Sequence, residues 1–319
     1  MNILNQIVVI MLNISLWSGR KKLRPEDLAA NGIEVDKLPP GTLASLGTKR
    51  IIAPEALNPF SALKKEAERI CLAKGVRFLG GFAIPKENVD KLVEELKEIK
   101  QRFQETKESL LSDYDKEIDK WIAENPPEWA AVIRAAIEPA STIDQAMHFN
   151  FAPVVVGSPE GMEDTNEGLD EETDGLLGQL YHEVRMQAKT AFEASFVGRK
   201  EITRKALRPI LSMREKLLGL SFLDPEIAEA IQAIDQVIDK VPKTGPIIGT
   251  DLDMIAGLVG RRLANIGRPL PPEPEPEPEA VEEEAPAEEE VEILEERIVF
   301  NSPPALLKQK KRAPLVFDF

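Results

Sequence analysis

The chain has 319 residues and a formal net charge of −15, from 40 Lys and Arg residues against 55 Asp and Glu residues. Hydrophobic residues make up 43% of the sequence, so a folded body is expected, and the aromatic content of only 5% favours helix packing over a β-sandwich. The single cysteine, Cys71, excludes an intrachain disulfide framework and a multi-cysteine zinc site, and it fits a reducing compartment.

The apolar N-terminal segment Ile3–Trp17 predicts a buried strand, because it contains the β-branched Val8, Val9, Ile10 and Ile14 and alternates between apolar and polar residues from Leu12 to Leu16. No Lys or Arg precedes Arg20, so the basic start of a signal peptide is missing. Asn5, Gln6 and Asn13 interrupt the run of about 20 apolar residues that a membrane span needs. A membrane-associated segment and a wrongly assigned start of the chain are the alternatives to the strand.

The longest predicted element is a helix over residues 86–124, a stretch of 39 residues without Gly or Pro. Apolar residues three or four apart form a coiled-coil-like seam along it. The seam consists of Val89, Leu92, Leu96, Ile99, Phe103, Leu110, Tyr114, Ile118 and Trp121, with Thr106 at one further position. This seam packs either within the chain, as part of a helical bundle, or between copies, as a homo-oligomer through the long helix.

The remaining elements predict a mainly α body over residues 1–270, with a few short β-strands. Helices are expected near residues 25–28, 61–73, 129–137, 176–196, 200–218, 225–241 and 251–266, and strands near residues 76–84 and 149–156. Between them, residues 158–175 are expected to form an acidic loop, since residues 160–174 hold eight acids and no base. The loop echoes a calcium-binding motif only weakly, because the closing Glu is missing.

No segment carries the chemistry of an enzyme. The phosphate-binding glycine motifs are absent, and the two histidines, His148 and His182, lie in no metal-binding or catalytic pattern. We therefore expect a non-enzymatic protein with no catalytic residues, no metal and no cofactor. An enzyme whose residues converge only in space is the least favoured alternative.

A basic segment is the first candidate for binding. Residues 183–218 hold nine bases against four acids, at helical spacing. The candidates for contact with phosphates are Arg199, Lys200, Arg204, Lys205 and Arg208. A solvated helix face, a contact with the chain's own acidic segments and a partner protein are the other interpretations.

The C-terminal tail is the second candidate. Residues 271–297 hold 13 Glu and one Arg, which together supply −12 of the net charge, and alternating Pro and Glu predict a disordered, extended linker. The apolar and basic tail peptide 298–319 follows, with Leu315, Val316, Phe317 and Phe319 as candidate partner-binding residues. Its end is weakly similar to peptides that dock on bacterial sliding clamps and to the tips of single-stranded-DNA-binding proteins. Docking on the chain's own body and a purely solubilising role are the alternatives.

Several segments together resemble one protein family. They are Leu16–Leu23, Ser45–Gly47, Phe78–Pro85, Ser195–Arg199, Lys205–Pro209 and Lys216–Pro225. Over roughly residues 12–265 the chain is similar to the bacterial and phage family called Domain of Unknown Function 3150. Because this resemblance begins near Leu12, Met11 is an alternative start to Met1, with an untranslated apolar prefix before it.

The resemblance implies no activity and no catalytic residues. It implies a cytoplasmic product of a phage or mobile genetic element, in a family often encoded near a MoxR-type AAA ATPase and a von Willebrand A-domain protein. An accessory protein that binds such partners, without a membrane, is the expectation. A nucleic-acid-associated factor of replication or recombination is the alternative.

Overall fold

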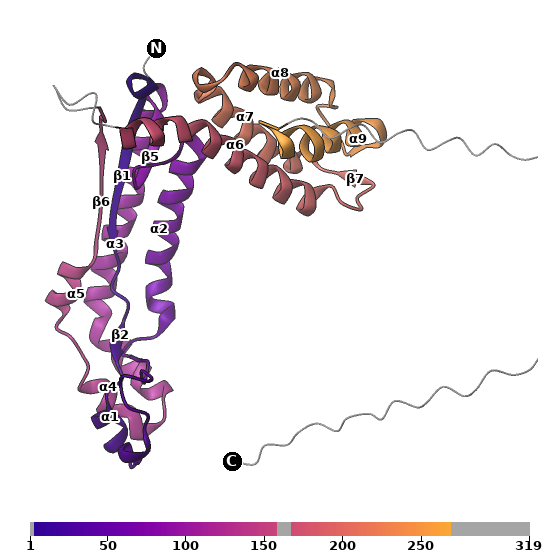
Figure 1. Ribbon diagram of the computed structural model, residues 1–319. Helices are drawn as coiled ribbons and strands as arrows, with labels where there is room; N and C mark the ends of the chain where they lie inside the picture. Colours follow the sequence, from indigo (N-terminus) through magenta and orange to yellow (C-terminus); the bar gives the residue numbers. More distant parts are fainter. Residues whose placement is uncertain (1–2, 158–166, 269–319) are drawn as a thin grey trace, which may run out of the picture. The chain divides into compact units, whose positions relative to one another are not determined.

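The computed structural model describes residues 3–157 and 167–268, and residues Met1–Pro271 form one compact unit (Figure 1). The helices are α1 (Pro25–Ala29), α2 (Pro54–Lys74), α3 (Lys86–Glu124), α4 (Ala130–Arg134), α5 (Ala140–Ala146), α6 (Glu167–Ser195), α7 (Arg208–Gly219), α8 (Pro225–Lys240) and α9 (Gly249–Gly257). The strands are β1 (Ile7–Ser15), β2 (Arg20–Lys22), β3 (Thr48–Arg50), β4 (Val76–Phe78), β5 (Gly81–Pro85), β6 (His148–Val154), β7 (Glu201–Ile202) and β8 (Ile247–Ile248). The predicted fold class, mainly α with short strands, is confirmed. The linker 271–297 and the peptide 298–319 lie outside the described residues.

The predicted N-terminal strand is confirmed as β1, an inner strand of the four-stranded sheet. The sheet has the order β4-β5-β1-β6, and all neighbouring strands are antiparallel. Val9 lies opposite Ala83 of β5, and Ile14 lies opposite Phe149 of β6. Hydrogen bonds on both sides and burial by flanking helices explain why this segment is apolar.

Both faces of the first half of β1 are buried, each in a different core. Ile7 and Val9 are 2% and 1% exposed and belong to the core that α6–α9 complete. Ile10 is fully buried in the core between the sheet, α2 and α3. Alternate side chains of a strand point to opposite faces, so one strand serves both cores. The near-continuous apolar sequence of the strand follows from this position.

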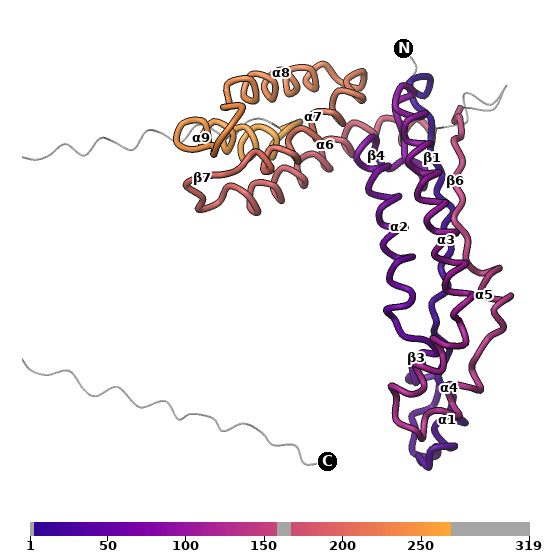
Figure 2. Tube along the Cα trace, turned by 180° about the vertical axis from the view of Figure 1, so that it is seen from behind, coloured from indigo at the N-terminus to yellow at the C-terminus, as the bar shows by residue number. Residues whose placement is uncertain are grey.

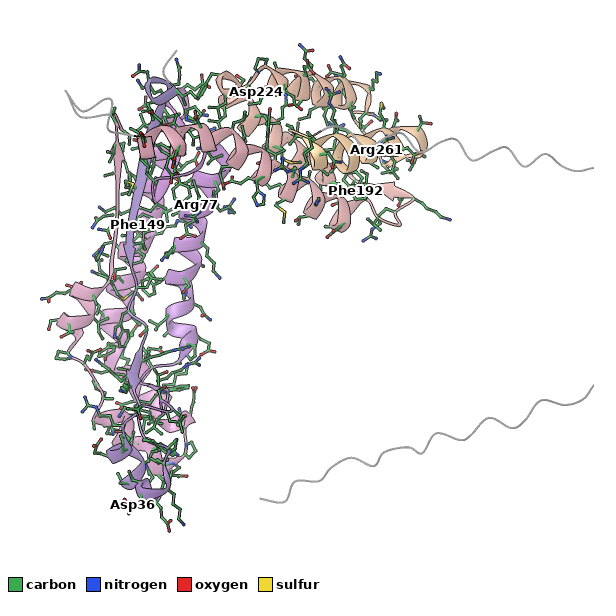
Figure 3. The ribbon with its side chains drawn as sticks, in the orientation of Figure 1. Asp36, Arg77, Phe149, Phe192, Asp224 and Arg261 are labelled. Atoms are coloured by element: carbon green, nitrogen blue, oxygen red, sulfur yellow. The ribbon has the colours of Figure 1, made fainter. Side chains whose placement is uncertain are left out.

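The long helix α3 has the predicted bounds and packs lengthwise against α2 (Figure 2). Phe103 on its seam contacts the ring of Phe60 on α2 edge-on, with ring centroids 5.2 Å apart. It also contacts Phe149 of β6, which Figure 3 labels, at 5.7 Å. The seam thus packs within the chain, which is the first of the two predicted alternatives. A homo-oligomer through another face of α3 remains a proposal.

One seam position differs from the prediction. Lys107 is buried at 9% exposure, while Thr106 lies at the seam's edge and donates to the carbonyl oxygen of Arg102. The Lys107 Nζ donates to the carbonyl oxygens of Asp144 and Met147, both at 3.0 Å. These carbonyls lie at the C-terminal end of α5, where backbone acceptors lack helical partners. Lys107 therefore caps α5, a short helix that the sequence did not reveal.

The predicted acidic loop is wrong from Glu167 onward, because α6 begins there. Residues 158–166 lie outside the described residues. Leu169 and Leu176 are 7% and 2% exposed, and their burial outweighs the cost of the glycine that precedes each of them. Acidic residues also suit the first turn of a helix, where the backbone dipole is positive.

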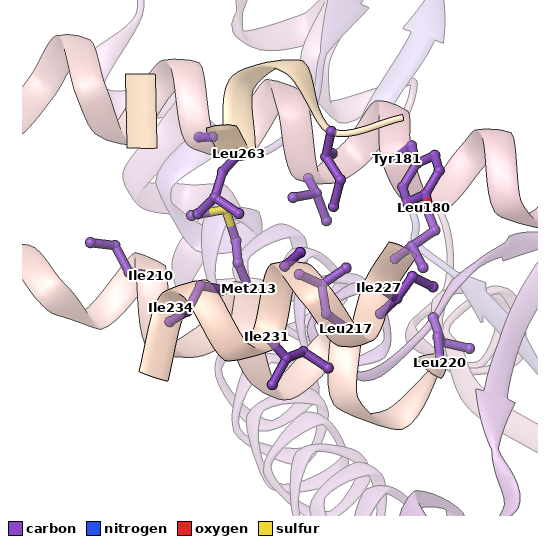
Figure 4. Packing of buried hydrophobic residues seen from close by; sticks show 14 of the residues in the cluster. Leu180, Tyr181, Ile210, Met213, Leu217, Leu220, Ile227, Ile231, Ile234 and Leu263 are labelled. Atoms are coloured by element: carbon purple, nitrogen blue, oxygen red, sulfur yellow. The ribbon is translucent and has the colours of Figure 1, made fainter. Parts of the chain in front are cut away.

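Helices α6–α9 enclose the second core. Leu217 of α7 and Ile231 and Ile234 of α8 belong, with Leu180 of α6, to one hydrophobic cluster, part of which Figure 4 shows. Asp224 (Figure 3) caps α8 by accepting a hydrogen bond from the backbone N–H of Glu226 at 2.7 Å. Helix α7 begins at Arg208 rather than the predicted Lys200. The proline that follows Arg208 favours a helix start there, because it fits the first helical turn.

A polar cluster around Glu138 joins the end of β1 to the connection between α4 and α5. The Trp17 Nε1 donates to Glu138 Oε2 at 3.0 Å, and the Lys21 ammonium pairs with the other carboxylate oxygen. The Tyr114 hydroxyl donates to the carbonyl oxygen of Glu138 at 3.0 Å. The Lys21 ammonium is the main group that holds the pKa of Glu138 below its ordinary value of 4.5. Burial opposes this effect, and the hydrogen bond from Trp17 lowers the pKa further.

This lowered pKa predicts a stability that falls in acid. Glu138 binds fewer protons in the folded chain, so its contribution is present above pH 4.5 and is lost as the pH falls through the lowered folded pKa. Glu138→Gln should lower the free energy of unfolding near neutral pH by about 1–2 kcal/mol and flatten its decline in acid. Urea unfolding at a series of pH values measures both effects. The exposed Glu128→Gln is the control, and equal pH profiles for the two variants would contradict the prediction.

Candidate interaction site

The predicted cations lie around the connection between α6 and α7. After α6 the chain turns at Gly198, whose φ of +69° lies in the left-handed region that favours glycine. Phe196, Ile202 and Leu207 are buried at 6%, 6% and 1% exposure and anchor this connection to the core. Strand β7 pairs with β8, which fixes the backbone between the anchors. The intervening side chains are therefore directed to the surface.

All five predicted cations lie on this connection or at the first residue of α7, and we call them the basic corner: Arg199, Lys200, Arg204, Lys205 and Arg208. Each is exposed. The Arg204 Nη1 donates to the carbonyl oxygen of Pro242 at 2.6 Å. Within residues 3–157 and 167–268, the other four side chains have no ion pair or hydrogen bond. The charge of the basic corner is thus not neutralised by this part of the chain.

A shallow hollow of about 360 Å³ lies at the basic corner. Arg199 and Lys205 line it together with the hydroxyl-bearing Ser195 and Thr203, and Glu201 lines its wall. Guanidinium, ammonium and hydroxyl groups are donors that suit phosphate or carboxylate oxygens. The arrangement fits binding of an anionic surface.

The other bases of residues 183–218 do not form one continuous cationic face with the basic corner. Lys216 is buried at 2% exposure and pairs with Glu183, and Arg214 forms a two-bond ion pair with Asp235. Arg185 donates to the carbonyl oxygen of Ile266 at 2.8 Å. These residues were not among the five candidates, and the spacing of bases in the sequence does not show which cations are committed to internal partners.

The residues with possible redox or acid–base chemistry lie apart from one another. Cys71 is fully buried on α2, and this burial raises the pKa of its thiol to about 12. His182 is exposed on α6, and His148 Nε2 lies 3.1 Å from the Asn13 Oδ1. In residues 3–157 and 167–268, no three His, Cys, Asp or Glu side chains are grouped as a metal site would require.

The sequence indicates a basic turn at residues 20–22, but it did not show the larger group of cations to which this turn belongs. Strands β2 and β3 form a separate two-stranded antiparallel ribbon, which we call the basic ribbon. It contains Arg20, Lys21, Lys22, Lys49 and Arg50. The two strands are far apart in the sequence, so only their pairing brings the charges together. The available signal was a glycine before each strand, Gly19 and Gly47.

The predicted docking residues of the tail lie outside the described residues: Leu315, Val316, Phe317 and Phe319. In the part of the chain that is described, none of the helices combines the length and the apolar character needed to cross a bilayer.

Comparisons with known proteins identify one family. No curated protein and no solved structure matches the chain. Residues 4–263 match the family described as "Protein of unknown function (DUF3150)". The match begins before the expected limit near Leu12, so the apolar residues ahead of Met11, which form the first half of β1, lie inside it. The match covers most of the chain, and the chain therefore belongs to the DUF3150 family.

Proposed function

We propose that this protein is a non-enzymatic accessory protein of a phage or mobile genetic element, and that it binds an anionic macromolecule at the basic corner. The observation that carries the proposal is the exposure of all five cations there, four of them without a side-chain partner among the described residues. Unpaired cations on a folded surface attract partners of opposite charge and steer their approach. The single buried cysteine fits action in the cytoplasm.

The first candidate partner is a protein, either a MoxR-type AAA ATPase or a von Willebrand A-domain protein. The family resemblance supports these two, since members are often encoded beside them. Acidic surface residues of such a partner would pair with the guanidinium groups of Arg199, Arg204 and Arg208. The C-terminal peptide 298–319 would provide a second contact through its apolar residues.

Neutralising the basic corner tests this proposal. Arg199, Lys200, Arg204 and Lys205 are replaced together by Gln, and the tagged chain is co-purified with the ATPase and the A-domain protein of the same genome. We expect recovery of the partner to fall by about tenfold or more, as loss of several charge-assisted contacts predicts. A control with Lys65, Lys86, Lys91 and Lys120 replaced by Gln has the same net charge and alters exposed lysines elsewhere.

A chain that ends at Leu270 forms the second arm of this experiment. Loss of the partner from the shortened chain alone would assign binding to the tail. If the basic-corner variant, the control and the shortened chain all recover the same proteins in the same amounts, neither the corner nor the tail is the binding site.

The second candidate function is association with nucleic acid, and the unpaired cations of the basic corner favour it as well. Binding to DNA at this site would weaken as salt rises, because cations that neutralise phosphates release condensed counterions. The same four-residue variant should then lose DNA binding, whereas the lysine control should keep it.

A further inference from the structure

We propose that the basic ribbon binds the phosphate backbone of a nucleic acid. The strand register places Arg20 opposite Arg50 and Lys21 opposite Lys49. Since alternate residues of a strand point to opposite faces, Arg20, Lys22 and Arg50 share one face, and Lys21 and Lys49 share the other. We call the first the outer face, because its three cations are exposed.

The inner face shows how the chain compensates for like charges that lie opposite each other on paired strands. Like charges directly opposite each other destabilise a pair of strands. On the inner face each lysine has its own acid: Lys21 pairs with Glu138, and the Lys49 Nζ lies 2.6 Å from the Asp27 Oδ1. Burial alone would raise the pKa of Asp27, but hydrogen bonds from Lys49 and from the backbone N–H of Arg24, together with the two positive charges, hold it below its ordinary value. The inner cations are thus neutralised and serve the fold.

The outer face has no such compensation. Among the described residues, the side chains of Arg20, Lys22 and Arg50 have no ion pair and no hydrogen bond. Arg20 and Arg50 face each other across the ribbon without an acid between them. This arrangement costs folding energy, and an external polyanion would remove the repulsion.

The backbone of the basic ribbon is held in place from both ends. The N–H of Ile51 donates to the carbonyl oxygen of Gly19 at 3.0 Å, and the N–H of Leu23 donates to that of Gly47 at 3.1 Å. The Trp121 Nε1 donates to the carbonyl oxygen of Arg50 at 3.2 Å, and Ile51 itself is fully buried. The outer cations are therefore presented by a fixed frame, which lowers the entropic cost of binding.

The geometry fits a polymer better than a small ion. Arg20 and Lys22 lie two residues apart on an extended strand, so their backbone positions are separated by about 6.7 Å, and Arg50 adds a second row. A linear row of cations follows a chain of phosphates, and a two-stranded ribbon is narrow enough to enter the DNA major groove.

The test measures the salt dependence of nucleic-acid binding. The full chain is titrated into a labelled DNA duplex and the corresponding single strand, at several salt concentrations, with fluorescence anisotropy as the signal. In the outer-face variant, Arg20, Lys22 and Arg50 are all replaced by Gln. We expect its affinity to fall by at least about tenfold, and the slope of log K against log salt to fall by about 2–3. A charge-retaining variant, Arg20→Lys, Lys22→Arg and Arg50→Lys, should restore most of the binding.

The matched control replaces the exposed Lys65, Lys91 and Lys120 by Gln, which changes the net charge equally. All variants are also made in the chain whose basic corner is neutralised, so failure of the corner and failure of the ribbon are distinguished. Thermal unfolding should show no loss of stability in the outer-face variant, since its replacements remove repulsion. An unchanged slope in that variant, an equal loss in the lysine control, or displacement of the DNA by polyglutamate at equal charge concentration would each overturn the proposal.

Discussion

A chain that begins at Met11 is expected to be unfolded or insoluble. It lacks Ile7, Val9 and Ile10, which are at most 2% exposed and belong to both cores. Burial of each such side chain contributes about 1.5–3 kcal/mol, so the three together contribute roughly 5–9 kcal/mol. That loss is comparable to the whole stability of a typical domain, about 5–15 kcal/mol. It also removes the backbone pairing of β1 with β5.

Expression of the two chains side by side, followed by circular dichroism and thermal unfolding, checks this expectation. A pair of point variants separates the strand from the mere length of the chain. Ile10→Asn places an amide in a fully buried position, whereas Met11→Gln changes a residue that is 37% exposed on the same strand. We expect the first to unfold the chain and the second to change stability by less than about 1 kcal/mol. A stable, cooperative chain from Met11 would show that the first half of β1 is dispensable.

The elements that the sequence predicted well are those whose signal is local. The helix over residues 86–124 has a long apolar period, no helix breaker, and Asn125 followed by two prolines at its end. Helix α6 was cut short because Gly168 and Gly175 and the surrounding acids indicate a loop in isolation. Leu169 is nevertheless buried, which favours the helix over a loop, and this burial depends on contacts with the rest of the fold.

The residues of the candidate site show the same difference between local signals and contacts with distant segments. The exposure of Arg199 and Arg208 follows from a local run of bases. The commitment of Lys216 to an internal pair depends on Glu183, which lies on another helix. The basic ribbon depends on pairing between β2 and β3, and the loop between them gives no sign of it. Contacts between distant segments are therefore what single-sequence reasoning missed.

Lys216 is the most consequential of these internal contacts. Its Nζ donates to the carbonyl oxygen of Leu72 at 2.8 Å and pairs with the Glu183 carboxylate. Leu72 lies in the last turn of α2, where carbonyl oxygens have no helical N–H partner. Lys216 therefore caps α2 from α7, and it places a cation at the negative end of the helix dipole. Burial lowers the pKa of Lys216, although Glu183 opposes the shift.

Lys216→Ala is expected to destabilise the chain by about 3–5 kcal/mol, the range for breaking a buried ion pair from one side. The Glu183 side chain is only 14% exposed and would keep a charge without its partner. The double variant Lys216→Met with Glu183→Gln removes that charge, so it should recover at least half of the loss. The exposed Lys189→Ala on α6 is the control and should change stability by less than about 0.5 kcal/mol.

Denaturant unfolding of the single variants Lys216→Met and Glu183→Gln and of their double variant gives the coupling energy between Lys216 and Glu183. A coupling of about 1–3 kcal/mol is expected for two groups in one buried network. The capped carbonyl of Leu72 makes a further distinction possible. If the double variant stays below the original chain while its coupling is large, the remaining deficit measures the lost cap on α2. If Lys216→Ala lowers the free energy of unfolding no more than Lys189→Ala does, the buried Lys216 ammonium contributes no more stability than the exposed Lys189 ammonium. Helix α2 then needs no cap from α7.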